Sequence, residues 1–331
     1  MGRIKKTKIM NIEAADNRKQ EFIFGPVPSR RLGRSLGVDL VPFKTCTYDC
    51  IYCQLGRTTN KTMQRKEWNP IDVVIEQLKK KLDYKPDYIT LSGSGEPTLC
   101  LQLEELISKI KNITNIPVAV LTNGSLLWLP EVRESIMKAD LVVPSLDAGS
   151  DASFQYVNRP HQDISFDKML KGLIKFRREY RGQYWLEVFL LGGVTTTDKE
   201  VRLLADCIGR IGPDRVQLNT VTRPPAESFA FPIPKEQLKN IASQLGDNVE
   251  IIADYQQVHA QETFVAKRDD VLELLRRRPC SIEDIAQGLG IHRNEVVKYI
   301  EDLTSQGKID SETQNNKLYY KIPLTHKPRF I

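Results

Sequence analysis

The stretch from Lys44 to Gly56 reads Lys-Thr-Cys-Thr-Tyr-Asp-Cys-Ile-Tyr-Cys-Gln-Leu-Gly, and it places three cysteines within eight residues. Cys46, Cys50 and Cys53 have the spacing C-x3-C-x2-C. Three thiolates can bind three irons of a cubane cluster and leave the remaining iron open, whereas a structural zinc site needs a full set of protein ligands. The nearest histidine, His161, is more than 100 residues away. The triplet therefore favours an iron–sulfur cluster over zinc.

The composition excludes several other classes of protein. The chain has 331 residues, of which 40% are hydrophobic and 27% charged, unlike a disordered, collagen-like or coiled-coil chain. No apolar run approaches the roughly 20 residues that a membrane helix needs, and residues 1–20 lack the hydrophobic segment of a secretory signal. Six scattered and clustered cysteines do not form a disulfide scaffold. We expect a cytoplasmic protein without a membrane partner.

The positive charge lies at the two ends of the chain. The 48 Lys and Arg outnumber the 42 Asp and Glu, which gives a net charge of +6. Residues 1–20 contribute +4 of this, residues 265–331 contribute +2, and the middle is neutral. A basic end indicates either an anionic partner or a solvated tail. The charge total therefore does not by itself predict nucleic-acid binding.

Short apolar runs alternate with amphipathic runs between residues 21 and 264, and Gly, Pro, Asn or Asp bound the apolar ones. The candidate strands are Gly37–Phe43, Tyr88–Gly93, Pro117–Thr122, Asp140–Leu146, Trp185–Leu191 and Arg215–Val221. The candidate helices are Pro70–Leu82, Leu103–Lys111, Pro130–Ala139, Phe166–Tyr180 and Thr197–Ile211, with a later helix at Lys235–Leu245 and a strand at Val249–Asp254. Six such units predict an α/β fold with a parallel sheet covered by helices. The pattern does not decide whether the sheet is open or curled into a partial barrel.

The pattern changes in residues 265–331, which we expect to form a second, small domain. Ser281 is a suitable N-cap for a short helix. The candidate helices are Lys267–Arg277, Ile282–Gln287 and His292–Ser305, a turn is expected at Gly288–Gly290, and the candidate strands are Ile309–Ser311 and Lys317–Ile322 around a polar tip at Glu312–Asn316. This order resembles the winged helix-turn-helix domain. Such a domain could bind tRNA, an operator or a leader peptide, or serve only for packing.

The cysteine triplet resembles that of the radical S-adenosylmethionine (SAM) superfamily, with the aromatic Tyr52 directly before the third cysteine. The resemblance implies a partial (β/α)6 TIM-like barrel over residues 21–264. It also implies one [4Fe-4S] cluster held by Cys46, Cys50 and Cys53. In this superfamily SAM binds the open iron and is cleaved reductively to a 5′-deoxyadenosyl radical, which abstracts hydrogen from a substrate. An external one-electron donor of the flavodoxin or ferredoxin type is implied as a partner.

Polar residues that follow three candidate strands resemble the superfamily's SAM-binding elements. The stretch Ser92–Thr98 resembles the G-G-E-P element with Ser94 inserted between the glycines. The resemblance implies contacts to SAM from Tyr52, Gly93, Gly95, Glu96, Asn123 and Ser145, and less directly from Asp147. The alternative for each residue is an ordinary role in a loop or at a helix N-terminus.

Several charged residues suggest additional anion contacts. The glycine- and proline-rich segment Phe24–Asp39 carries Arg30, Arg31 and Arg34, which could clamp SAM or substrate or form a surface hairpin. Other candidates are Arg159 and Arg223, which could each hold an anionic group, and Glu187, which we expect to face the barrel interior and to need a partner.

Residues 22–255 resemble one branch of the superfamily, iron–sulfur oxidoreductases that are grouped with the wyosine-tRNA synthetases. Those synthetases carry further cysteines upstream of the SAM motif, whereas no cysteine precedes Cys46 here. A single-cluster enzyme is therefore favoured over pyruvate condensation on a tRNA base. The substrate hypotheses are a tRNA base, or a peptide or protein gripped by the winged helix. A SAM- or redox-sensing DNA-binding regulator is the alternative from another class.

Overall fold

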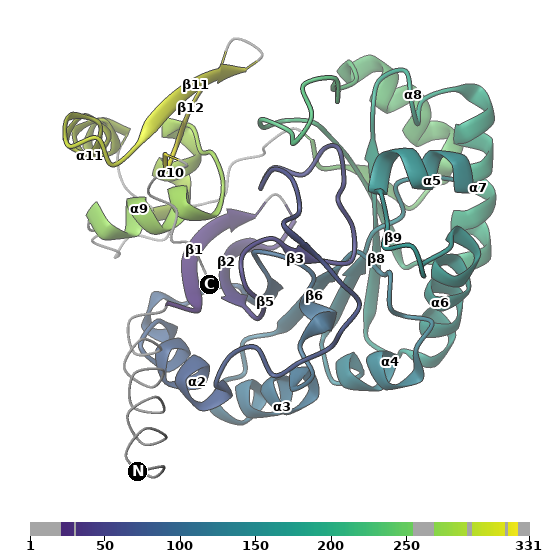
Figure 1. Ribbon diagram of the computed structural model, residues 1–331, viewed down its shortest axis with the longest axis horizontal. Coiled ribbons are helices and arrows are strands. Elements are labelled where there is room, and N and C mark those ends of the chain that lie inside the picture. The colour runs from purple at the N-terminus through teal and green to yellow at the C-terminus, as the bar shows by residue number, and fades with distance from the viewer. Residues whose placement is uncertain (1–20, 30, 254–267, 290–292, 315–316, 324–331) are drawn as a thin grey trace, which may run out of the picture.

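The computed structural model describes residues 21–29, 31–253, 268–289, 293–314 and 317–323. The predicted basic tail at residues 1–20, Arg30, His292 and the boundary at residue 264 lie outside these ranges. The described chain forms a large body around a curved sheet and a small body beside it (Figure 1).

The large body contains a sheet of eight strands in the order β1-β2-β5-β6-β7-β8-β9-β10. Seven strands run parallel, and only β1 is antiparallel to its neighbour β2. The strands are β1 (Ile23–Ser29), β2 (Gly33–Asp39), β5 (Tyr88–Ser92), β6 (Val118–Thr122), β7 (Leu141–Pro144), β8 (Gln183–Leu190), β9 (Arg215–Thr220) and β10 (Val249–Ile251). The sheet curls without closing, because β1 and β10 form its two edges. The predicted α/β fold with a mostly parallel sheet is confirmed.

Amphipathic helices cover the outer face of this sheet (Figure 1). They are α2 (Ile71–Lys79), α3 (Leu103–Ile113), α4 (Pro130–Ile136), α5 (Asp151–Asn158), α6 (Phe166–Glu179), α7 (Asp198–Ile211) and α8 (Lys235–Leu245). Short elements lie in the loops: β3 (Thr45–Cys46), β4 (Asn60–Lys61) and the 3-10 turns η1 (Leu82–Tyr84) and η2 (Pro97–Leu99). Each α-helix buries its apolar stripe against the outer face of the sheet. The inner face therefore remains available for a functional site.

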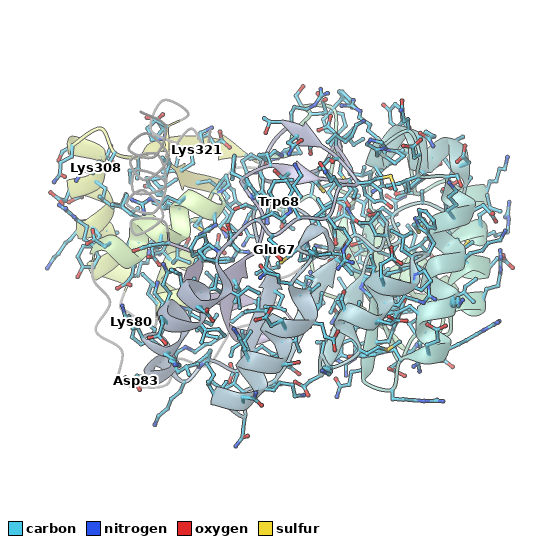
Figure 2. The ribbon with its side chains drawn as sticks, turned by 60° about the horizontal axis from the view of Figure 1, so that its bottom comes forward. Glu67, Trp68, Lys80, Asp83, Lys308 and Lys321 are labelled. Atoms are coloured by element: carbon cyan, nitrogen blue, oxygen red, sulfur yellow. The ribbon has the colours of Figure 1, made fainter. Side chains whose placement is uncertain are left out.

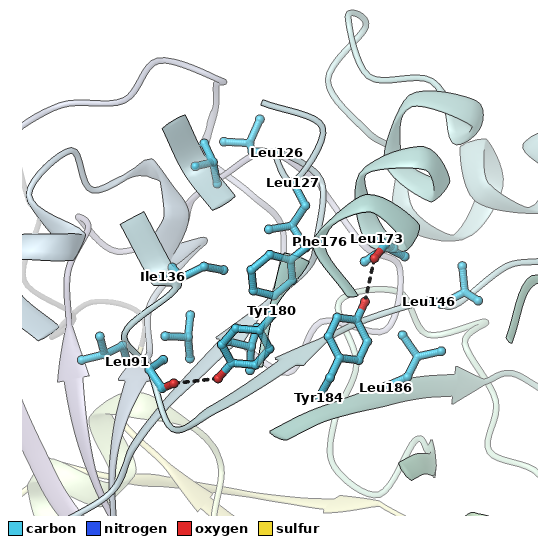
Figure 3. Packing of buried hydrophobic residues seen from close by; sticks show 14 of the residues in the cluster. Leu91, Leu126, Leu127, Ile136, Leu146, Leu173, Phe176, Tyr180, Tyr184 and Leu186 are labelled. Carbon is cyan, nitrogen blue, oxygen red and sulfur yellow. Dashed lines mark hydrogen bonds between the residues drawn. The ribbon is translucent and has the colours of Figure 1, made fainter. Parts of the chain in front are cut away.

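The hydrophobic core lies between the outer face of the sheet and the helices (Figure 3). Phe176 and Tyr180 stack with ring centroids 4.9 Å apart, and both are fully buried. The buried Tyr180 hydroxyl donates to the carbonyl of Ala139 at 2.7 Å, so its burial leaves no hydroxyl group without a hydrogen bond. The lone cysteines Cys100 and Cys207 are buried here as apolar residues, as expected.

Two features of the barrel differ from the prediction. The first parallel strand is β2 at Gly33–Asp39 and not Gly37–Phe43, because the chain turns after the buried Leu40 and Val41. The helix α5 was not predicted, although Ser150 caps it by accepting from the backbone of Ser153. The strand was misplaced because the apolar run continues past the end of β2. The helix α5 was missed because it is short and polar and shows no apolar periodicity.

The small body contains α9 (Arg268–Arg277), α10 (Ile282–Leu289), α11 (Arg293–Ser305) and the antiparallel pair β11 (Asp310–Gln314) and β12 (Lys317–Lys321). Cys280 adds an antiparallel bridge to Tyr320 of β12, with backbone hydrogen bonds in both directions. Ser281 caps α10 as predicted, since its hydroxyl accepts from Asp284 N at 3.2 Å.

Two boundaries in the small body were predicted wrongly. The helix α10 continues through the expected turn to Leu289, because that side chain is buried in the domain core. The strand β11 extends to Gln314, into the expected polar tip, because Thr313 pairs with Leu318 across the hairpin.

The small body packs against one edge of the barrel. Helices α9 and α10 contact β1, and Val27 of that strand joins the apolar cluster of the small body. The Tyr319 hydroxyl donates to the carbonyl of Thr222, just after β9, at 2.6 Å. Figure 2 shows this domain, marked by Lys308 and Lys321, beside the barrel. It therefore reaches from the β1 edge to the carboxyl end of β9.

Candidate active site

A cavity of about 400 Å³ lies on the inner face of the sheet, where the parallel strands end. This is the edge at which α/β barrels place their functional groups. Its lining includes all three clustered cysteines, the loop after β5, and residues of the small body. Residues that are far apart in the sequence therefore share one wall.

The three cysteine sulfurs lie on the loop around β3, and each is half-buried. Each accepts one hydrogen bond from a side-chain nitrogen: Cys46 from Asn123 at 3.6 Å, Cys50 from Asn158 at 3.5 Å, and Cys53 from Lys44 at 3.8 Å. Such donors stabilise negative charge on sulfur and tune a metal centre.

The surroundings of the sulfurs favour the neutral thiol over the thiolate unless a positive charge lies nearby. Burial, and then the carboxylate of Glu96, raise the pKa of Cys46 to about 12. Burial and then Asp147 raise the pKa of Cys50 well above its ordinary value. Among the described residues, no three His, Cys, Asp or Glu side chains converge on the position of a single metal ion. The three cysteines thus line one cavity without forming a site for a single metal ion.

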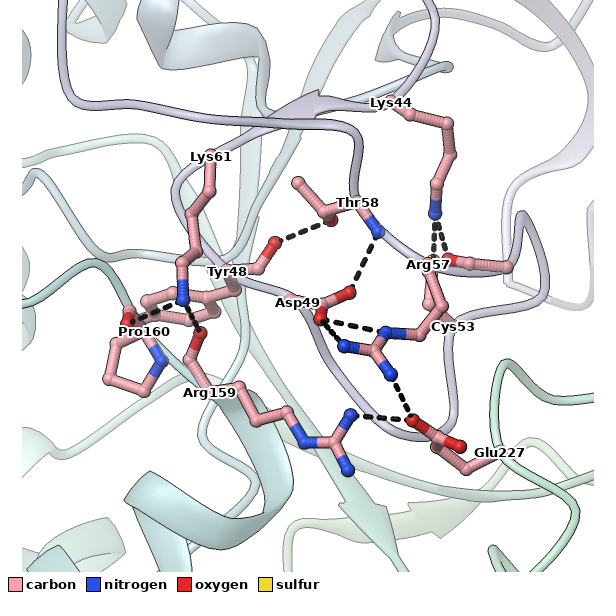
Figure 4. A network of polar contacts seen from close by, with 11 residues as sticks. Lys44, Tyr48, Asp49, Cys53, Arg57, Thr58, Lys61, Arg159, Pro160 and Glu227 are labelled. Atoms are coloured by element: carbon pink, nitrogen blue, oxygen red, sulfur yellow. Dashed lines mark hydrogen bonds and ion pairs between the residues drawn. The ribbon is translucent and has the colours of Figure 1, made fainter.

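A polar network fixes the far side of the cysteine loop (Figure 4). The Asp49 carboxylate accepts from Arg57 at 2.9 Å and from the backbone of Thr58 at 2.7 Å. Glu227 accepts from Arg57 at 2.7 Å and from Arg159 at 2.6 Å. Arg159, expected to hold an anion, therefore holds a carboxylate of this chain and does not line the cavity.

Gly93 and Gly95 allow the loop after β5 to approach the rest of the site closely. Gly93 has a φ of +111°, and a Cβ there would meet the carboxylate of Asp39. A Cβ on Gly95 would meet the backbone carbonyl of Thr45, beside Cys46. Both positions require glycine, and both glycines line the cavity.

Ser94, the residue inserted between these glycines, links the loop to the small body. The Asp39 carboxylate accepts from Ser94 N at 2.7 Å and from its hydroxyl at 3.0 Å. Arg277 of α9 pairs with Asp39 and donates to the Ser94 hydroxyl at 3.0 Å. Burial lowers the pKa of Arg277 to about 10. The insertion thus forms a three-residue contact between the barrel and α9.

Glu96 is buried and saturated by groups of the barrel itself. Its carboxylate accepts from the Thr98 hydroxyl at 2.6 Å, the Thr122 hydroxyl at 2.5 Å and Asn123 N at 2.8 Å. Burial raises its pKa and these donors oppose the rise. Glu96 and Asn123 do not line the cavity. They join β5 to β6, and Asn123 in turn donates to Cys46 and to Thr47.

Tyr52 and Asp147 form another layer of the wall. The Tyr52 ring stacks on Phe189 with centroids 3.9 Å apart, and its hydroxyl donates to Asp147 at 2.5 Å. Asp147 also accepts from Asn158 at 2.7 Å. Burial raises the pKa of Asp147 to about 6. Tyr52 lines the cavity, whereas Asp147 lies behind it.

Glu187 faces the interior of the barrel and has partners, as expected. Its carboxylate accepts from Arg31 at 2.7 Å and from Asn219 at 2.9 Å. Glu187, Arg31 and the expected SAM contact Ser145 all line the cavity. Arg34 does not; it points to the other face of β2, and its Nε and Nη2 have no hydrogen-bond partner among the described residues.

Similarity to known proteins bears directly on this arrangement. Residues 40–208 match the Radical SAM superfamily, and this segment contains the cysteine loop, the Gly93–Gly95 loop and Glu96. The chain belongs to the radical SAM superfamily. It is thus an enzyme of the radical SAM class, whose members work with a [4Fe-4S] cluster and SAM.

Related chains extend over most of this radical SAM protein. The UPF0026 protein of Methanocaldococcus jannaschii is 34% identical over 308 residues, which cover 90% of this chain and 94% of that one. A protein of Brachyspira hyodysenteriae named GTPase Obg is 40% identical over 309 residues, or 92% of this chain. The match covers only 45% of that relative, so this chain spans less than half of its length.

Two solved structures share the fold. Streptococcus suis SuiB bound to its precursor peptide SuiA has a TM-score of 0.51 at 14% identity, over 64% of this chain and 47% of that one. A radical SAM methyltransferase from Sphaerobacter thermophilus has a TM-score of 0.50 at 18% identity, over 66% of each chain. At these identities the likeness concerns the fold alone.

The donor set of this radical SAM protein fits a cubane cluster. Three cysteines on the wall of one cavity suit a cluster in which each thiolate binds its own iron. The nitrogen donor at each sulfur and the cradle formed by Gly95 support the same fit. A cluster also supplies the positive charge that buried thiolates need.

Sequence reasoning missed four residues of the site: Lys44, Asn158, Asp39 and Arg277. Asn158 lies beside the expected Arg159, and Lys44 begins the cysteine stretch, so both could have been suspected from their positions. Asp39 and Arg277 meet only after the small body docks, and neither carries a local signal. The run Arg276–Arg278 before Pro279 was the only hint of cationic residues at that place.

Proposed function

We propose that this chain is a single-cluster radical SAM enzyme in which Cys46, Cys50 and Cys53 hold one [4Fe-4S] cluster. The observation that carries the proposal is the set of three loop sulfurs, each with one nitrogen donor, on the wall of a cavity at the strand ends. When bound, the cluster supplies the electron that cleaves SAM to a 5′-deoxyadenosyl radical for hydrogen abstraction. The electron comes from an external donor of the flavodoxin or ferredoxin type.

The expected SAM residues divide into two groups by position. Tyr52, Gly93, Gly95 and Ser145 line the cavity and are proposed to touch SAM. Three further residues brace them from behind and are proposed to position them: Glu96, Asn123 and Asp147. Glycine backbone and small hydroxyls suit a ligand that must approach closely. The bracing groups keep these atoms in place, since their own hydrogen bonds lie within the barrel.

The small body is proposed to be a winged helix. The order of three helices and a hairpin, with Cys280 bridged to β12, supports this assignment. Its exposed helix α11 carries Arg293 and Lys298 but also Glu301 and Asp302, so its charge is mixed. This pattern gives weak support to the tRNA-base substrate that the wyosine-like resemblance suggests.

A peptide substrate gripped by the small body is the alternative, and a SAM-sensing regulator is another. Bulk tRNA binding to the full chain tests the tRNA hypothesis against both alternatives. If tRNA is the substrate, the wild type should bind it, and the double variant Arg293→Glu/Lys298→Glu should not. Unchanged binding in that variant, or no binding by the wild type, would contradict the tRNA hypothesis.

The free thiols of a cluster enzyme need a reducing compartment, which supports a cytoplasmic location. Among the described helices, none is long and apolar enough to cross a bilayer.

Anaerobic reconstitution tests the main proposal. The wild type should retain about four irons per chain and form 5′-deoxyadenosine from SAM with dithionite. Cys50→Ala should lose both the iron and the product. The matched control is Cys207→Ala, which removes a buried thiol of α7 remote from the cavity and should retain both. Wild-type protein that takes up no iron, or a Cys50→Ala variant with wild-type iron, would overturn the proposal.

A further inference from the structure

The wall of the cavity carries more positive charge than the barrel alone suggests. Among the described residues that line it, five are cationic and only Glu187 is a carboxylate. The cationic residues are Arg31, Lys44, Arg223, Arg277 and Arg278. Two of them, Arg277 and Arg278, come from the carboxyl end of α9 in the small body.

Carboxylates compensate this charge unevenly. Arg31 is paired directly with Glu187 at 2.7 Å, and Arg277 is paired with Asp39. Arg223 is 3.6 Å from the nearest oxygen of Asp284, which is beyond ordinary hydrogen-bond distance. Ser281 donates twice, at 3.0 Å, to the other oxygen of that carboxylate, Oδ2, so Arg223 lies near Oδ1 without a close ion pair.

Arg223 is therefore under-compensated at the seam between barrel and small body. Its side chain is 93% buried, since only 7% is exposed, and its Nε has no hydrogen-bond partner among the described residues. Burial, and then the neighbouring Arg278, lower its pKa, and Asp284 opposes the shift. The carboxylate of Asp284 acts on both arginines, and an oxyanion in the cavity could in addition accept from the Nε of Arg223.

SAM does not fully supply this anion. It is itself a cation at neutral pH, because its ammonium and sulfonium groups outweigh its single carboxylate. A bidentate guanidinium best matches a phosphate or carboxylate. A cavity of about 400 Å³ that also holds SAM has room for a further small chemical group but not for a bulky one.

We propose that the substrate carries an oxyanion, a phosphate or a carboxylate, which binds at the seam between Arg223 of the barrel and Arg278 of the small body. The assignment of this ligand as substrate rests on the proposed radical SAM function. The small body would then complete the substrate site. Its exposed face would in addition recognise a binding partner.

Calorimetry on the cluster-loaded full chain with SAM tests this site. The probes are inorganic phosphate and acetate at constant ionic strength, and we expect at least one of them to bind. Arg278→Gln and Arg223→Lys should each weaken that binding roughly tenfold or more. Arg223→Lys retains the charge but loses the fork, so it is the safer variant for folding. The matched control Arg276→Gln removes an exposed charge from the same helix and should bind as the wild type does.

The outcomes separate the two proposals. Phosphate binding or acetate binding identifies which oxyanion the seam prefers. Absence of binding by both probes, or equal binding by the seam variants and the wild type, would overturn the oxyanion site. Formation of 5′-deoxyadenosine with dithionite is measured on the same wild-type sample. If that product fails to form while the seam still binds an anion, the radical SAM function fails and the anion site stands.

Discussion

The barrel and the small body contribute different chemistry to the same cavity. The barrel contributes thiols, hydroxyls and glycine backbone from loops at the ends of parallel strands. The small body contributes two guanidinium groups from the end of a single helix. The first set is brought together by the topology of the sheet, which places all the strand ends at one edge. The second set arrives only by docking, so it depends on an interface.

This difference implies that the two contributions fail in different ways. Damage to the barrel loops should remove the cluster. Damage to the interface should leave a cluster but misplace the loop at Ser94 or the charge at the seam. The four predictions below test this division, from the largest expected effect to the smallest.

Gly95→Ala should have the largest effect, because a Cβ there meets the backbone carbonyl of Thr45. Backbone cannot move aside cheaply, so we expect a loss of roughly 1–3 kcal/mol or more in stability together with most of the bound iron. Iron content and thermal unfolding measure this. Gly209→Ala is the control, since a Cβ there meets nothing within 4 Å and a helix favours alanine. Normal iron content in Gly95→Ala would break the link between this loop and the cluster.

Arg277→Gln should weaken the interface and leave Asp39 without its cationic partner. Asp39 is 6% exposed and, within the part of the chain that the structure describes, would retain only the donors of Ser94. The Arg277 side chain is 20% exposed, so its removal should cost less than the about 3–5 kcal/mol of a fully buried pair, and it should spare the iron that Gly95→Ala loses. We expect weaker SAM binding with normal iron content, measured by calorimetry.

A double-mutant cycle sharpens this result. Asp39→Asn removes the orphaned charge, so the combined variant should lose less stability than the two single losses added together. Simple additivity would show that Arg277 and Asp39 do not act as a pair. Arg276→Gln should behave as the wild type.

The interface should weaken as pH rises. Burial, and then the neighbouring Glu21, raise the pKa of Glu273 from 4.5 to about 8, and Lys81 opposes the shift. A carboxyl with a higher pKa in the folded protein binds its proton more tightly there. Its contribution is therefore present at low pH and is lost as pH rises toward the folded pKa.

We expect the free energy of unfolding to fall by roughly 1 kcal/mol or more between about pH 5 and about pH 8. Glu273→Gln should flatten that slope in denaturant titrations. Glu283→Gln, which removes a carboxylate paired with Arg293 on the exposed side of α10, should retain it. An identical slope in Glu273→Gln would contradict the assignment to this group.

Arg57→Gln should have the smallest effect. Its side chain is 59% exposed, although it bridges Asp49 and Glu227 on the cysteine loop. Exposed ion pairs contribute little, and the backbone of Thr58 still donates to Asp49. We expect the rate of iron loss to a chelator to change roughly twofold or less. A loss as large as that in Gly95→Ala would show that this network, and not the glycine cradle, holds the loop.

The sequence predicted the repeating part of the barrel well and its margins poorly. Parallel strands that are buried on both faces read as apolar runs, so β5 to β9 were found near their observed positions. The edge strand β1 contains Gly25, Pro26 and Pro28, which are unusual in strands and tolerated at an edge. It was therefore not among the candidate strands. A surface hairpin was one of the two interpretations of Phe24–Asp39, and β1 and β2 do pair as an antiparallel hairpin.

The sequence predicted which residues belong to the candidate site, but not which of them line the cavity and which support the lining from behind. The spacing of the triplet and the glycine pair pointed to Cys46 and Gly95 without any structure. The resemblance implied that Glu96 contacts SAM, and that role stays a prediction. The structure gives its carboxylate barrel partners instead, because Thr98 and Thr122 surround it. Hydrogen bonds between neighbouring strands cannot be read from one strand at a time.

The sequence by itself determined the chemistry that short spacing encodes: three thiols on one loop, close glycines and an alternating α/β chain. These features depend on residues a few positions apart, whose geometry the backbone fixes locally. Only the tertiary structure decided what the small body does for the site. Asp39, Ser94 and Arg277 are separated by up to 238 positions and meet because apolar surfaces of β1, α9 and α10 dock. Docking is set by the sum of buried area and charge over an interface, and no short pattern in the chain records that sum.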